Sequence, residues 1–134
     1  MHKNLQFVRK YPVSLLVVIT ISVLSLIPIV QNPVPSLEIT DKWAHCLMYL
    51  TLTLCIWTEY LLRNKHPQAR HLALWACAAP IIMGGVLEIL QATCTGGHRS
   101  GEWLDFVANT IGVLTGSAIG MLLVAILSRS RKDD

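Results

Sequence analysis

The sequence predicts an all-α integral membrane protein, a polytopic bundle of four transmembrane helices in a single domain that covers residues 1–134. Hydrophobic residues make up 53% of the chain and charged residues only 14%, whereas soluble domains carry about 25% charged residues. The mean hydropathy is +0.52, and apolar runs of membrane-spanning length recur along the chain. This composition argues against a soluble enzyme and against a disordered chain.

A loop that contains two prolines separates the first two predicted spans. Residues 12–30 contain no charged side chain, and as a helix they would be about 28 Å long, close to the hydrocarbon thickness of a bilayer. Pro33 and Pro35 mark residues 31–36 as the loop. The second span covers about residues 43–62, and it follows the polar segment Thr40-Asp41-Lys42.

The third predicted span covers about residues 72–91, and the fourth covers about residues 104–127. The loop between them, residues 93–102, contains three glycines and Cys94. Small residues recur at every fourth position of the last span: Ala108, Gly112, Gly116 and Gly120. Such a face allows close approach of another helix, which we expect to belong to the same chain, although the sequence leaves the oligomeric state open.

Lysine and arginine are distributed unevenly between the predicted loops. Nine of the eleven lie at the N-terminus, between the second and third spans, or at the C-terminus: Lys3, Arg9, Lys10, Arg63, Lys65, Arg70, Arg129, Arg131 and Lys132. The positive-inside rule therefore places both termini in the cytoplasm, an N-in/C-in topology. Because this pattern accounts for the net charge of +3, we expect no nucleic-acid partner.

Polar side chains interrupt the apolar pattern at the predicted outer ends of three helices. They are Asp41, Lys42, His45 and Tyr49 at the start of the second helix, Glu88 and Gln91 at the end of the third, Arg99, Ser100 and Glu102 in the loop, and Asp105 and Asn109 at the start of the fourth. Asp41, His45 and Tyr49 recur at every fourth position and share one helix face. Because ionisable groups inside a membrane are costly, we expect an outward-facing polar pocket, with two helix N-termini directed toward it.

Each of these residues also has a purely structural interpretation. Asp41 and Asp105 could serve only as helix caps, and His45 could be an interhelical hydrogen-bond partner. Arg99 could pair with Glu88 or Asp105 to hold the bundle together. Near the opposite membrane face, Glu59 and Arg63 are expected to form a surface ion pair.

Metal and triad chemistry are weakly indicated by the sequence. His45, His98, Glu88 and Asp105 could bind a metal ion, but the chain contains no HExxH motif and no Cys/His cluster. We therefore expect no metal ion and no cofactor. A triad of Ser100, His45 and Asp105 can be written, although no spacing in the sequence requires it.

The ordered set of motifs resembles the VanZ-like family of bacterial membrane proteins. The matching segments are Asp41-Lys42-Trp43-Ala44-His45-Cys46-Leu47-Met48-Tyr49, Glu88-Ile89-Leu90-Gln91, Arg99-Ser100, and Asp105 to Gly112 with Gly116. The resemblance implies a multi-pass protein of the bacterial cytoplasmic membrane. It also implies a role with lipid head groups or lipid-linked envelope precursors, and an influence on susceptibility to the glycopeptide teicoplanin.

Three functional hypotheses follow from the polar residues. The first is an enzyme, a lipid head-group hydrolase or transferase, in which Asp105, Glu88 and His45 perform acid–base catalysis. In this enzyme the residues Arg99, Lys42, Asp41, Tyr49, Gln91, Ser100 and Asn109 would bind the substrate. The second is a non-catalytic module that binds lipids or amphiphilic antibiotics. The third is a bundle in which the polar cluster only fixes helix register.

Overall fold

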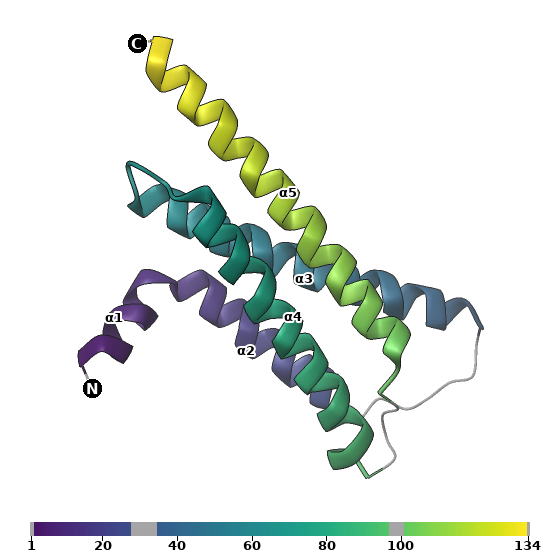
Figure 1. Ribbon diagram of the computed structural model, residues 1–134. Helices are drawn as coiled ribbons and strands as arrows, with labels where there is room; N and C mark the ends of the chain where they lie inside the picture. The colour runs from purple at the N-terminus through teal and green to yellow at the C-terminus, as the bar shows by residue number, and fades with distance from the viewer. Residues whose placement is uncertain (1, 28–34, 97–100, 134) are drawn as a thin grey trace.

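The computed structural model describes residues 2–27, 35–96 and 101–133. Within these ranges the chain forms helices and no strand, which confirms the all-α prediction (Figure 1). The helices are α1 (His2–Lys10), α2 (Pro12–Leu26), α3 (Pro35–Arg63), α4 (Ala69–Cys94) and α5 (Trp103–Asp133).

Three of these helices are long and apolar enough to cross a membrane, namely Ile39–Arg63 of α3, α4 and α5. Helix α2 is apolar but has only 15 residues, so it is about 22 Å long and shorter than a hydrocarbon core of about 30 Å. Residues 28–30 of the predicted first span lie outside the described residues. The structure therefore supports a membrane protein with three candidate membrane-spanning helices.

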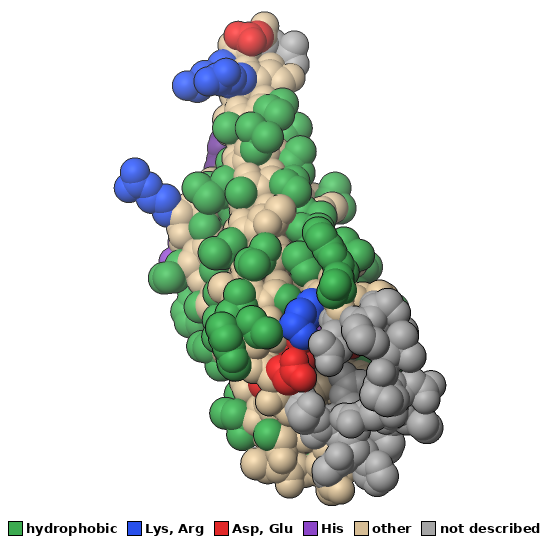
Figure 2. All heavy atoms as spheres, turned by 90° about the vertical axis from the view of Figure 1, so that its right-hand side faces the viewer, with side chains coloured by type: hydrophobic (Ala, Val, Ile, Leu, Met, Phe, Trp, Pro, Cys, Tyr) green, Lys and Arg blue, Asp and Glu red, His purple; other side chains and the backbone are tan. Residues whose placement is uncertain are grey.

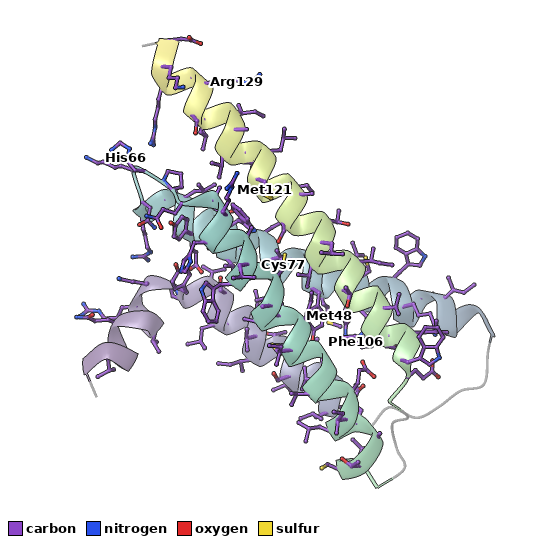
Figure 3. All side chains as sticks on the ribbon, viewed as in Figure 1. Met48, His66, Cys77, Phe106, Met121 and Arg129 are labelled. Carbon is purple, nitrogen blue, oxygen red and sulfur yellow. The ribbon has the colours of Figure 1, made fainter. Side chains whose placement is uncertain are left out.

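The helices alternate in direction, so that α2 and α4 run opposite to α3 and α5 (Figure 1). Helices α3 and α5 make the most extensive contact, α4 packs against α5, and α2 packs against α3 and α4. His66 in the α3–α4 connection and Arg129 near the end of α5 lie at the same end of the molecule (Figure 3). Arg131 reinforces this end, because its guanidinium donates a hydrogen bond to the carbonyl oxygen of Lys65.

Hydrophobic side chains are spread along the middle of the face seen in Figure 2, and charged side chains lie near its top and in its lower part. Large apolar residues such as Leu74, Ile82 and Leu122 are at least 60% exposed. The interior contains a cluster of Ile21, Tyr49, Leu52, Leu87 and Val113, against which Met48 and Cys77 pack (Figure 3). An apolar exterior is what a lipid environment favours.

The small-residue face of α5 packs against α3, as expected for a contact within the chain. A Cβ atom added to Gly112 would overlap the carbonyl oxygen of Cys46, and one added to Gly120 would overlap the indole ring of Trp57. A Cβ atom at Gly116 would lie 2.9 Å from the Cβ of Thr53. Glycine at these positions therefore allows the two backbones to approach closely.

The observed helix ends differ from the predicted ones. Helix α3 begins at Pro35 rather than near Trp43, so Pro35 and Ser36 belong to a helix and not to a loop. Proline is well suited to the first turn, where its missing N–H costs no helical hydrogen bond. Cys94 is the last residue of α4 rather than a loop residue, and α5 continues through its basic tail to Asp133.

Glu59 is not the surface ion-pair partner that the sequence predicted. Its exposed fraction is 8%, and its carboxylate accepts hydrogen bonds from the backbone N–H groups of Val13 and Ser14 at 2.8 and 3.0 Å. The hydroxyl of Ser14 donates a third hydrogen bond at 2.6 Å. Tyr11, the N-cap residue of α2, makes no capping bond through its side chain within the described residues. The side chain of Glu59, from α3, therefore caps the N-terminus of the neighbouring helix α2.

Candidate functional site

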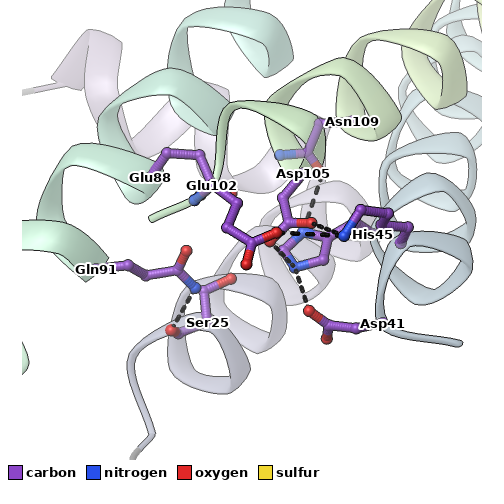
Figure 4. A network of polar contacts seen from close by, with 9 residues as sticks. Ser25, Asp41, His45, Glu88, Gln91, Glu102, Asp105 and Asn109 are labelled. Carbon is purple, nitrogen blue, oxygen red and sulfur yellow. Dashed lines mark hydrogen bonds and ion pairs between the residues drawn. The ribbon is translucent and has the colours of Figure 1, made fainter. Parts of the chain in front are cut away.

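The contact between α3 and α5 joins the two polar stripes that the sequence predicted. Asp41 and His45 lie one turn apart on α3, and Asp105 and Asn109 lie one turn apart on α5 (Figure 4). Gly112, on the small-residue face of α5, lies one turn after Asn109 and approaches the backbone of α3 at Cys46. This close approach also brings the polar side chains of the two helices together.

His45 lies at the centre of the cluster, with an exposed fraction of 2%. Its Nδ1 and the amide oxygen of Asn109 are 3.1 Å apart. Because an amide oxygen can only accept, Nδ1 carries the proton and donates it. In the neutral imidazole, Nε2 is then an acceptor, and it lies 3.8 Å from Oδ2 of Asp41 and 3.8 Å from Oδ2 of Asp105.

Lys42 and Glu102 form the outer edge of the cluster. Lys42 Nζ lies 3.2 Å from Oε2 of Glu102 and 3.7 Å from Oδ1 of Asp105. Asp105 is 5% exposed, and its buried Oδ1 has no hydrogen-bond partner among the described residues. The sequence placed Glu102 among the polar residues of the loop but predicted no role for it, because its contact with Lys42 joins residues that are 60 positions apart.

Glu88 and Gln91, one turn apart on α4, have different surroundings. Glu88 accepts a hydrogen bond from the backbone N–H of Glu102 at 3.1 Å and so fixes the start of α5 against α4. Gln91 donates a hydrogen bond to the carbonyl oxygen of Ser25 at 2.7 Å, away from His45 (Figure 4). The structure therefore brings Glu88 to the edge of the site, whereas Gln91 joins α4 to α2.

Tyr49 lies one turn below His45 on α3 and is 1% exposed. Its hydroxyl is buried without a hydrogen-bond partner in the part of the chain that the structure describes. A Cβ atom on Gly84 would lie 3.4 Å from this hydroxyl and 3.2 Å from Nδ2 of Asn109. Tyr49, Gly84 and Asn109 therefore form the tightly packed floor of the site.

An apolar groove opens beside the cluster, between α3 and α5. Its volume is about 290 Å³, and it is lined by Ile39, Lys42, Trp43, Cys46, Ala108 and Ile111. This volume is close to the lower limit of about 300 Å³ for small-molecule sites. The sequence did not predict the groove, because its two walls come from helices that are distant in the chain.

Two expectations about the surroundings of the site change. Because α3 begins at Pro35, its N-terminus lies six residues, about 9 Å, before Asp41. The helix dipole acts mainly within the first turn, so only the N-terminus of α5 contributes at the site. Arg99, Ser100 and His98 lie outside the described residues, and the roles expected for them stay predictions.

No family model, curated protein or solved structure matches the chain. The resemblance to the VanZ-like family therefore rests on the sequence motifs alone and stays a prediction. The described residues therefore form an all-helical protein with three candidate membrane-spanning helices and a half-buried polar cluster at the contact of α3 and α5.

Proposed function

We propose that the chain is a four-span protein of the bacterial cytoplasmic membrane with both termini in the cytoplasm. The alternating helix directions support this topology, because they gather Arg63, Lys65, Arg70 and Arg129 at one end of the bundle. Under the positive-inside rule this end is cytoplasmic. In this arrangement the cluster around His45 lies near the outer surface.

The function proposed for this site is action on the head group of a phospholipid or of a lipid-linked envelope precursor. The observation that carries the proposal is the apolar groove, which opens on the hydrophobic exterior and includes Lys42 in its wall. An acyl or polyprenyl chain fits the apolar lining, and Lys42 would meet the phosphate of its head group. Arg99 is proposed as the second cation for that phosphate.

The chemistry would be hydrolysis or transfer at the head group. His45, with Nδ1 held by Asn109, is oriented to take a proton through Nε2, and Asp105 is the carboxylate beside it. Glu88 would act from α4, where it already fixes the backbone at Glu102. Asp41, Tyr49, Gln91 and Ser100 remain proposed substrate-binding residues, with Gln91 acting through the position of α4.

The alternative is a module that binds lipids or amphiphilic antibiotics without turnover. One observation favours it: Nε2 of His45 lies 3.8 Å from the carboxylates of Asp41 and Asp105, beyond hydrogen-bonding distance, so the described residues contain no preformed proton relay at this nitrogen. An influence on teicoplanin susceptibility, as the family resemblance implies, would follow from either function.

The test compares variants for lipid binding and for turnover. Purified protein is incubated with vesicles that contain phosphatidylglycerol or a polyprenyl phosphate, and bound lipid and products are identified by mass spectrometry. Asp105→Asn should retain lipid but lose product formation, whereas Lys42→Gln should lose lipid. Lys65→Gln, at the opposite end, is the matched control and should behave as wild type.

Each outcome selects one function. Product formation that Asp105→Asn abolishes supports the enzyme, and binding without any product supports the binding module. Absence of lipid from the wild-type protein, or equal binding by Lys42→Gln, would refute both. A comparison of lipids in cells with and without the protein would identify the natural substrate.

A further inference from the structure

The cluster at the contact of α3 and α5 holds more carboxylates than cations. Asp41, Glu102 and Asp105 surround His45 and Lys42. Among the described residues, these ion pairs join three carboxylates and one ammonium group. When His45 is neutral, the formal charge of the cluster is therefore −2. The side chains of Asp41 and Glu102 are 47% exposed and that of Asp105 only 7%, so repulsion between the carboxylates is strongest at Asp105, where burial reduces the screening by water. The cluster therefore attracts further positive charge.

The atoms that face one another have the types and spacing of metal ligands. Nε2 of His45 and one carboxylate oxygen each from Asp41 and Asp105 all lie within 4.8 Å of one another, and both histidine–carboxylate distances are 3.8 Å. For metal–ligand bonds of about 2.0–2.2 Å, tetrahedral ligands lie about 3.3–3.6 Å apart. Small rotations of the three side chains would bring these nitrogen and oxygen atoms to the spacing of tetrahedral ligands.

Two further observations point to a ligand at this position. In the neutral imidazole, the hydrogen bond from Nδ1 to Asn109 leaves Nε2 with a lone pair that faces one carboxylate oxygen each of Asp41 and Asp105. These three electron-rich atoms repel one another unless a cation lies between them. Asp105 is 5% exposed; its Oδ2 faces Nε2 of His45 at 3.8 Å, and its Oδ1, on the side of Lys42, has no hydrogen-bond partner within the described ranges. Lys42 Nζ, at 3.7 Å from that oxygen, is also beyond hydrogen-bonding distance.

The geometry points to a binding site for one divalent transition-metal ion, with His45 Nε2, Asp41 and Asp105 as the protein ligands. One imidazole nitrogen and two carboxylate oxygens suit Zn²⁺, and a charge of +2 would neutralise the cluster. This differs from the expectation of no metal site, because the ligands come from two helices and form no local motif. Asn109 would hold the imidazole in the metal-binding tautomer.

The test measures metal binding by the full chain in detergent, with Zn²⁺ alone as the probe. The protein is stripped with a chelator, titrated with Zn²⁺ by calorimetry, and examined by absorption spectroscopy after substitution with Co²⁺. We expect one ion per chain and a Co²⁺ spectrum typical of tetrahedral coordination. Asp41→Asn should weaken binding by more than about 10-fold, since even the loss of a supporting hydrogen bond to a ligand costs about 10–100-fold.

Glu102→Gln is the matched control for charge, because it removes one carboxylate of the cluster that is not among the three proposed ligands and so separates the effect of charge from that of ligation. It should bind Zn²⁺ within about three-fold of wild type. The side chain of Asp41 is 47% exposed, so Asp41→Asn should fold normally, and a melting curve without metal verifies this. Asp105→Asn and His45→Gln serve as second variants for the other two ligands.

Three results would overturn the inference. They are failure of the stripped wild-type protein to bind Zn²⁺ at pH 7, binding that Asp41→Asn and Asp105→Asn leave unchanged, and binding that Glu102→Gln weakens as much as Asp41→Asn does. The inference is independent of the proposed lipid function, because the titration contains no lipid substrate and either result can fail alone.

Discussion

Replacing Gly112 by alanine tests the close contact of α3 and α5 on which the site depends. The added Cβ atom would overlap the carbonyl oxygen of Cys46 and lie 3.0 Å from the backbone nitrogen of Leu50. Both neighbours are backbone atoms, so no side-chain rotation can relieve the overlap, and α5 must move away from α3. We expect this displacement to lengthen the contact between His45 and Asn109, which lies one turn from Gly112.

The magnitude follows from two opposing effects. Overpacking of a close contact costs about 1–3 kcal/mol, whereas exchanging glycine for alanine inside a helix contributes up to about 1 kcal/mol of stability. We therefore expect Gly112→Ala to lower the free energy of unfolding by about 1–2 kcal/mol. Reversible unfolding in mixed detergent, followed by circular dichroism, measures this change.

Gly85→Ala is the matched control in the same kind of helix interior. Its Cβ atom would meet the ring of Phe106 at 3.4 Å, an ordinary contact, so only the gain in helix propensity should remain. We expect stability equal to wild type or higher by up to about 1 kcal/mol. Equal effects of Gly112→Ala and Gly85→Ala would refute the packing of α5 on α3 described above.

Three other predictions concern the cap, the floor of the site and the topology. Glu59→Ala should reduce stability by about 2 kcal/mol, because it leaves the first N–H groups of α2 without their carboxylate, whereas Thr58→Ala should have little effect in the same unfolding assay. Gly84→Ala should displace Asn109 and Tyr49 and weaken lipid or Zn²⁺ binding more than it weakens folding; unchanged binding would contradict the proposed floor. A membrane-impermeant maleimide should label exposed Cys94 in intact spheroplasts but not a Cys94→Ser variant, and labelling that needs permeabilised cells would refute the N-in/C-in topology.

The sequence by itself determined the class of the protein and the composition of its polar faces. Apolar runs predicted the helices α3, α4 and α5, because their length and hydropathy are local properties. The four-residue spacing of Asp41 and His45, and of Asp105 and Asn109, placed each pair on one face by helical geometry alone. The same reasoning identified the small-residue face of α5 as a contact surface.

Only the tertiary structure decided which of these helix faces are in contact and in which axial register. The register of α5 on α3 is set where Gly112 and Gly120 approach Cys46 and Trp57, and helical periodicity within one segment contains no information about that register. The register brings His45 between Asp41 and Asp105.

The roles of Glu59 and Gln91 were decided in the same way. Their partners, Ser14 and Ser25, belong to α2, which is distant from them in the chain. Glu59 was expected to pair with Arg63 because only neighbours on the same helix can be identified from spacing. Its carboxylate instead serves the N-terminus of α2, because unpaired backbone N–H groups in an apolar environment cost more than an exposed ion pair contributes.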